Sequence, residues 1–141
     1  MENIAGIANT GFLVALLNRT DTKHSSVVAL YTGQTHPILV PQTVLAETAY
    51  LVGKVSAVTT LVTFLRSLKR SRFQLVALID QDLERIAEIL EEYQDSRIDF
   101  VDASVMAVAE RYEAHTIFTI DQRDFRIFRP RHVAYLHLLP A

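Results

Sequence analysis

The sequence predicts an α/β fold, a three-layer α/β/α sandwich with a mostly parallel central sheet. Short apolar segments alternate along the chain with longer segments of helical periodicity, a pattern typical of a parallel sheet with helices on both faces. The segments at 4–8 and 116–120 are mainly apolar without strict alternation, as in strands buried on both faces. At 141 residues the chain has the size of one ordinary domain, so we expect residues 1–141 to form a single domain.

Five segments are expected to be strands, the last of them at an edge of the sheet: 4–8, 37–41, 73–77, 116–120 and 133–138. Pro37 and Pro41 bracket the second of these segments. Proline suits the ends of a strand because it cannot donate a hydrogen bond to a neighbouring strand.

The segments between the strands have the apolar spacing of helices. We expect helices at 12–17, 23–31, 44–52, 57–69, 80–93 and 100–113. Ser56, Asp80 and Asp99 stand at the starts of the last three, where a side-chain oxygen can accept hydrogen bonds from free backbone N–H groups.

The composition favours an ordered protein that does not span a membrane. Hydrophobic residues make up 50% of the chain, and no run approaches the roughly 18 apolar residues of a membrane helix. The chain has no cysteine, which excludes disulfides and thiolate metal sites, and no leader-like N-terminus, so we expect a cytoplasmic location. The net charge of −2 conceals basic clusters at 69–72 and 123–131, so an anionic polymer remains a possible partner.

Four polar residues are predicted to meet at one site. Asn9 and Asp121 each follow a predicted strand, and ligands of open α/β sheets bind at the carboxyl ends of strands. Glu47 and Asp102 lie in the first turns of predicted helices that would pack beside those strand ends. Converging carboxylates require a cation to offset their mutual repulsion.

Each of the four residues also has a purely structural interpretation. Asp102 stands three residues after Asp99, so this pair alone is better explained by capping of a helix. Asp121 could cap a short turn, and Asn9 could simply end the first strand. Glu47 favours a site, because apolar residues surround it and an ionised Glu is rarely buried without a partner.

Four segments, in order along the chain, resemble the motifs of PIN domains of the VapC toxin type. They are 8–18 (ANTGFLVALLN), 44–51 (VLAETAYL), 99–110 (DFVDASVMAVAE) and 118–125 (FTIDQRDF). Each motif alone is weakly specific, but the four in this order are fairly specific, and the resemblance spans about residues 7–128.

The resemblance implies a divalent-metal-dependent endoribonuclease, the toxin of a toxin–antitoxin pair. By similarity, Asn9, Glu47, Asp102 and Asp121 occupy the catalytic and metal-binding positions, and their oxygen donors suit Mg²⁺ or Mn²⁺. The family has an aspartate where this chain has Asn9, so we expect an enzyme that is inactive or weakened as written. A natural Asn and an engineered replacement of Asp both fit the sequence.

Several neighbouring residues are expected to support the site. Thr10 and Thr119 could orient a carboxylate or a water, although ordinary threonines at strand ends explain them equally well. Asp99 and Asp124 flank the proposed ligands Asp102 and Asp121 in the sequence. The RNA-binding candidates, which would meet backbone phosphates unless they only form a solvated basic face, are Arg123 and Arg126.

The partners expected from the resemblance are RNA, a cognate antitoxin and a second copy of the chain. The apolar faces of 57–68 and 87–93 are candidates for self-association or for receiving an antitoxin segment, with core packing as the alternative. Two other functions remain open. The chain could be a catalytically degenerate PIN-like module that binds RNA or protein, or an enzyme of small-molecule phosphoryl transfer, which the absence of a P-loop disfavours.

Overall fold

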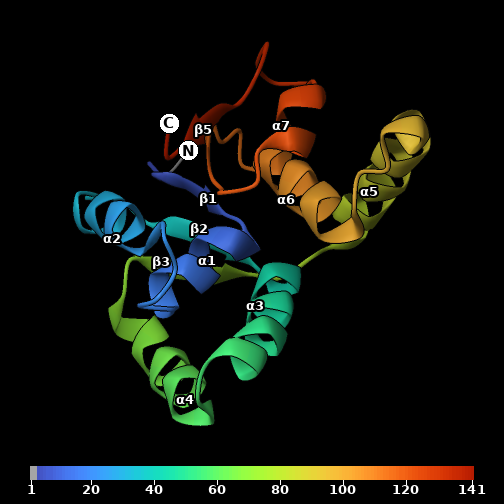
Figure 1. Cartoon of the computed structure of the whole chain (residues 1–141). Helices are drawn as coiled ribbons and strands as arrows, with labels where there is room; N and C mark the ends of the chain where they lie inside the picture. The colour runs from blue at the N-terminus through green and yellow to red at the C-terminus, as the bar shows by residue number, and fades with distance from the viewer. Residues whose placement is uncertain (1–2) are drawn as a thin grey trace.

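A computed structural model describes residues 3–141 and contains a parallel five-stranded sheet with the order β3-β2-β1-β4-β5 (Figure 1). The strands are β1 (Gly6–Ala8), β2 (Ile38–Pro41), β3 (Phe73–Val76), β4 (Thr116–Phe118) and β5 (His137–Leu139). All pairings are parallel, which confirms the predicted sheet.

Helices connect the strands and cover both faces of the sheet (Figure 1). They are α1 (Thr10–Leu17), α2 (His24–Thr32), α3 (Gln42–Val55), α4 (Val58–Ser67), α5 (Asp80–Glu92), α6 (Phe100–Arg111) and α7 (Arg123–Ile127), with short 3₁₀ helices at Leu68–Arg70 and Gln94–Ser96. The chain winds outward from β1 to β3, then crosses to β4 on the other side of β1. Because such crossovers are right-handed, the helices of the two halves lie on opposite faces, as a three-layer sandwich requires.

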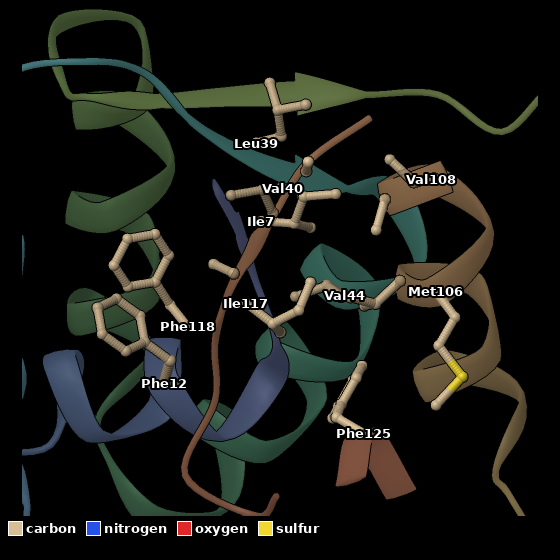
Figure 2. Close-up of a cluster of buried hydrophobic side chains, with 14 of the residues drawn as sticks. Ile7, Phe12, Leu39, Val40, Val44, Met106, Val108, Ile117, Phe118 and Phe125 are labelled. Carbon is tan, nitrogen blue, oxygen red and sulfur yellow. The ribbon is translucent and has the colours of Figure 1, made fainter. Parts of the chain in front are cut away.

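The core forms where the central strands meet these helices. Ile7 of β1 and Ile117 of β4 are fully buried, as are Phe12 of α1 and Val44 of α3 (Figure 2). The ring of Phe12 packs on Phe118 with centroids 5.3 Å apart. Burial of one such aliphatic or aromatic side chain contributes roughly 1.5–3 kcal/mol, so the central strands are the best-anchored part of the fold.

Gly6 allows β1 and β4 to approach closely. Its φ is 155°, and a Cβ at this position would lie 2.4 Å from the carbonyl oxygen of Thr116. Only glycine fits both the conformation and the space. The pairing of these two strands matters because Asn9 follows the first and Thr119 follows the second.

Of the three residues predicted to cap helix starts, one does so and two do not. Asp99 caps α6, accepting from the backbone N–H groups of Val101 at 2.6 Å and Asp102 at 3.2 Å. Ser56 does not cap α4, because Ala57 occupies the N-cap position. Asp80 is already helical, and it is Asp82 that accepts from the N–H preceding α5.

The ends of several elements also differ from their predicted positions. The first strand starts at Gly6 rather than at residue 4, and the last lies at His137–Leu139 rather than at 133–138. Helix α1 begins two residues earlier than predicted, at Thr10, and the short α7 was not predicted. In the part of the chain that the structure describes, no helix is long and apolar enough to cross a membrane.

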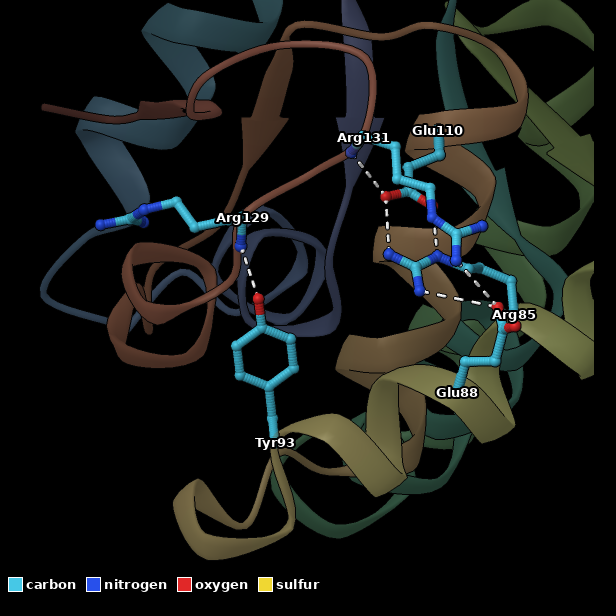
Figure 3. Close-up of polar contacts among 6 residues, drawn as sticks. All are labelled: Arg85, Glu88, Tyr93, Glu110, Arg129 and Arg131. Atoms are coloured by element: carbon cyan, nitrogen blue, oxygen red, sulfur yellow. Dashed lines mark hydrogen bonds and ion pairs between the residues drawn. The ribbon is translucent and has the colours of Figure 1, made fainter.

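Ion pairs connect α5 with α6 (Figure 3). Arg85 donates to Glu110 through Nε at 2.6 Å and through Nη2 at 3.1 Å, and Glu110 also accepts from the backbone N–H of Arg131. A second pair joins Arg111 of α6 to the buried carboxylate of Asp82 at 2.9 Å. The Glu110 carboxylate raises the pKa of Arg85 above its usual value. These charges are compensated in pairs, which suits a structural role.

Candidate active site

The predicted site lies at the point where the winding of the sheet reverses. Strands β1 and β4 are adjacent although they are far apart in sequence, and their outward connections run in opposite directions. Ligands of doubly wound folds bind outside the carboxyl ends of the strands at this reversal. Asn9 follows β1 directly, and its backbone N–H donates to the carbonyl of Phe118 at 2.9 Å. One end of the site is therefore held by two buried, hydrogen-bonded strands.

Asn9 is the centre of the polar contacts. Its side chain is buried, with 5% of the residue exposed. The amide Nδ2 donates to Asp102 Oδ1 at 3.0 Å and approaches Thr119 Oγ1 at 3.4 Å. The amide oxygen Oδ1 is buried and has no hydrogen-bond partner. An unpaired buried acceptor is costly, so this oxygen is a candidate ligand for a cation or a polar group.

Asp102 projects from the first turn of α6 into the same cluster. Burial raises the pKa of its carboxyl to about 8, and the neighbouring Asp124 carboxyl, together with the charge of Asp99, adds to the rise. The hydrogen bond from Asn9 acts in the opposite direction and favours the ionised form. Asp102 is therefore a half-buried carboxyl whose negative charge is incompletely compensated by protein groups.

Asp124 is the second carboxyl of this cluster, because its side chain lies within hydrogen-bonding reach of Asp102. It stands in the first turn of α7, next to the buried Phe125 that anchors this short helix in the core. Arg123 donates to Asp124 Oδ1 at 2.7 Å and to the carbonyl of Ser96 at 2.9 Å. Asp124 is thus held by the hydrogen bond from Arg123 and by the burial of Phe125 next to it in the sequence.

Asp121 lies in the exposed loop between β4 and α7. Its carboxylate accepts a long hydrogen bond, 3.4 Å, from the backbone N–H of Arg123. Thr119, which is fully buried, donates its hydroxyl proton to the carbonyl oxygen of Asp121 at 2.8 Å. Thr119 therefore fixes the backbone of this loop as well as contacting Asn9. Of the two acids near the end of β4, Asp124 is the one whose carboxyl raises the pKa of Asp102.

Glu47 approaches from α3 and is half-buried. It stands one turn after Thr43, on the same face of the helix. Thr43 Oγ1 lies 2.6 Å from Ser104 Oγ of α6, so this face of α3 is turned toward α6. Glu47 therefore lies on the side of α3 that faces the helix of Asp102.

The oxygen donors of the site are suited in part to a divalent cation. Within residues 3–141, no group of three or more His, Cys, Asp or Glu side chains forms a ready-made metal centre. The residue that would complete such a group is an amide, and its oxygen is the unpaired Oδ1 of Asn9. Two adjacent carboxyls and an orphaned buried oxygen suit a hard cation, so the residues fit Mg²⁺ or Mn²⁺ with a weakened donor set.

The remaining predicted residues have varied surroundings. Thr10 begins α1 and is buried, and its hydroxyl has no hydrogen-bond partner. Arg126 is exposed on α7 and donates to Gln122 Oε1 at 2.8 Å. The contact between Asp102 and Asp124 was missed by sequence reasoning. The signal for it was the sequence Asp124-Phe125, in which an apolar anchor follows the acid.

A known protein family and several individual proteins are similar to this chain. A profile of the PIN domain family matches residues 8–129. Ribonuclease VapC26 of Mycobacterium tuberculosis is 32% identical to this chain over 124 residues, which cover 88% of this chain and 92% of VapC26.

Solved structures share the fold. VapC20 of Mycobacterium tuberculosis, described as a toxin that cleaves the sarcin–ricin loop, matches with a TM-score of 0.80 and 22% identity, covering 92% of this chain and 98% of that one. A chain of a toxin–antitoxin complex from Klebsiella pneumoniae matches with a TM-score of 0.67 and 16% identity, covering 86% of this chain and 90% of that one. These matches confirm the α/β/α architecture.

Proposed function

Because the chain belongs to the PIN domain family, in its VapC-type group of ribonucleases, we propose that it is a divalent-metal-dependent endoribonuclease whose activity is weakened by Asn9. The toxin–antitoxin context of similar proteins extends the proposal: this chain is the toxin of such a pair. The observation that supports it best is the contact of Asn9, Asp102 and Asp124 at the reversal of the sheet.

Asn9 supplies a hydrogen-bond donor where a carboxylate would supply charge. Its Nδ2 donates to Asp102 Oδ1, so the amide satisfies an oxygen that a cation would otherwise bind. A unit charge pair about 4 Å apart at an effective dielectric of about 20 is worth about 4 kcal/mol, which is an upper bound for the charge that Asn9 lacks. Desolvation reduces this figure. The affinity for metal is accordingly expected to be lowered but not abolished.

The proposed ligands of Mg²⁺ or Mn²⁺ are Asn9, Glu47, Asp102 and Asp121, with Asp124 added because of its contact with Asp102. When bound, such an ion neutralises phosphate charge and makes a water molecule more nucleophilic. The chain's own contribution is to hold Asp102 through Asn9 and to hold Asp124 through Arg123. Carboxylates that are already held in place lose little orientational freedom when they take up a ligand.

Arg123 and Arg126 are the proposed contacts to RNA. Both are exposed on α7, the helix that also carries Asp124. Their charge would attract backbone phosphates that the carboxylates alone would repel. Attack of water on phosphorus, with cleavage of the bond to the 3′ oxygen, would leave a 5′-phosphate and a 3′-hydroxyl. These termini are a measurable signature of the proposed hydrolysis.

The test is to compare the parent chain with Asn9→Asp on structured RNA. Cleavage should increase in the variant, require Mg²⁺ or Mn²⁺ and stop with EDTA. The same substitution at the exposed Asn3 is the matched control and should leave cleavage unchanged. Equal, EDTA-insensitive traces for the parent and Asn9→Asp would exclude the nuclease assignment.

A second candidate function is a module that binds RNA or protein without cutting it. The hydrogen bond from Asn9 to Asp102 favours this alternative, because it links two site residues without a metal. Such a module should bind RNA or a protein partner equally well in EDTA and in Mg²⁺. A loss of RNA binding on removal of the metal would argue against it.

We also propose a protein antitoxin and a second copy of this chain as partners. Helix α4 exposes Val58 and Leu65, at 69% and 43% of their surface. Apolar side chains on one short helix are suited to burial by another chain. Light scattering at high protein concentration tests the homodimer, and a strictly monomeric mass would exclude it. Failure to co-purify with the product of an adjacent gene would argue against the antitoxin.

A further inference from the structure

We propose that Thr43 and Ser104 are positioning residues that set the placement of Glu47 relative to Asp102. The inference rests on the proposed function, because it concerns the same acidic site. It identifies two hydroxyl groups that touch neither metal nor RNA. They would act through the two helices that present the acids.

The two hydroxyls form a directed chain of hydrogen bonds. Ser104 Oγ donates to the backbone carbonyl of Val101 at 2.6 Å. Thr43 Oγ1 lies 2.6 Å from Ser104 Oγ. A hydroxyl has only one proton to donate, and that of Ser104 is used toward Val101, so the Thr43 hydroxyl is the donor to Ser104. The chain therefore runs from Thr43 through Ser104 to Val101.

Both ends of this chain lie beside proposed ligands. Thr43 is in the first turn of α3, directly after the buried strand β2, and Glu47 stands one turn later on the same face. Val101 immediately precedes Asp102 in the first turn of α6. A hydroxyl bonded to a carbonyl three residues earlier also adjusts the local helix geometry. The chain thus ties the helix of Glu47 to the turn that holds Asp102.

Burial makes this link effective. Ser104 is fully buried, so water does not compete for its hydrogen bonds, and such bonds are stronger in a low-dielectric interior. Thr48 on the same helix provides a contrast. It is also fully buried, but its hydroxyl has no hydrogen-bond partner. Two buried threonines on one helix therefore differ in whether they connect to α6.

This contrast defines the experiment. Thr43→Val and Thr48→Val remove a hydroxyl from the same helix with the same change of shape, and Thr43→Ser retains the hydroxyl. Mn²⁺ affinity is measured by titration calorimetry in the parent and Asn9→Asp backgrounds, with urea unfolding as the measure of stability. Groups that orient metal ligands typically change metal affinity about 10-fold or more when removed. Thr43→Val should weaken Mn²⁺ binding by about 10-fold, whereas Thr48→Val and Thr43→Ser should stay within about twofold.

Ser104→Ala should have the same effect as Thr43→Val, and the double variant should be no weaker than either single one, because both break one chain. Equal Mn²⁺ affinity in Thr43→Val and Thr48→Val would overturn the positioning role while leaving the metal site intact. Absence of Mn²⁺ binding in both the parent and Asn9→Asp would overturn the metal site and this proposal together. Loss of affinity in Thr43→Ser as large as in Thr43→Val would assign the effect to packing and also overturn the proposal.

Discussion

The carboxylates on the two sides of α6 have opposite kinds of surroundings. On the side toward α5, Glu110 receives two hydrogen bonds from Arg85, and Asp82 receives two from Arg111. On the side toward the sheet reversal, Asp102 has Asn9 as its hydrogen-bond donor and another carboxyl, Asp124, beside it. A paired charge is compensated, so removing its partner is costly, whereas a neighbouring carboxyl destabilises the ionised form of Asp102. Incomplete compensation of this kind is typical of functional sites.

The largest effect is expected from loss of the ion pair between Arg85 and Glu110, on the side of α6 toward α5. Glu110→Ala should lower the free energy of unfolding by about 3 kcal/mol, because it leaves the buried Arg85 with the half-exposed Glu88, 3.7 Å away, in place of its two hydrogen bonds to Glu110. Urea unfolding measures the loss. The control is Glu91→Ala, an exposed carboxylate on α5, which should change stability by less than about 0.5 kcal/mol. Similar losses in both variants would remove the distinction between the two faces.

Adding a negative charge beside Asp102 should strengthen metal binding. Asn9→Asp should raise Mn²⁺ affinity by about 10-fold or more, since even a third of the roughly 4 kcal/mol upper bound corresponds to a factor of 10. Calorimetry on the RNA-free protein measures this without reference to cleavage. Asn3→Asp serves as the control for net charge. An unchanged affinity in Asn9→Asp would show that residue 9 does not belong to a metal site.

Removing a negative charge from Asp102 or Glu47 should weaken metal binding. Asp102→Asn should weaken Mn²⁺ binding but leave the metal-free protein as stable as the parent, or more stable by about 1 kcal/mol, because it relieves repulsion with Asp124. Glu47→Gln should weaken metal binding in the same direction. Thermal unfolding in EDTA gives the stability, and a loss above about 2 kcal/mol for Asp102→Asn would instead assign this residue a structural role.

The smallest effect on stability is expected at Arg123, which pairs with Asp124 at the surface. Arg123 is largely exposed, so its ion pair with Asp124 should contribute less than about 1 kcal/mol to stability. Arg123→Ala should therefore change unfolding little but weaken RNA binding, most clearly at low salt. Filter binding over a salt series measures this. RNA affinity equal to the parent at every salt concentration would exclude Arg123 from the RNA-binding surface.

The sequence by itself determined the architecture. Short apolar runs such as 4–8 and 116–120 could be recognised as buried strands because burial on both faces demands continuous hydrophobicity. The cap at Asp99 followed from local chemistry, since a carboxylate two or three residues before free N–H groups needs no distant partner. The wrong caps at Ser56 and Asp80 show the limit of that reasoning, because a shift of one or two residues at a helix start exchanges capping and helical positions.

The contacts of the candidate site were decided by the tertiary structure. Sequence order predicted that Asn9, Glu47, Asp102 and Asp121 would meet at one site, but it did not reveal that Asp102 would have Asp124 as its neighbour. That contact depends on α7, a helix too short for a periodic signal, which is anchored by the burial of Phe125. The hydrogen bond from Asn9 to Asp102 spans 93 residues of sequence. Local patterns predict which residues can end a strand or start a helix, whereas packing of distant elements decides which side chains meet.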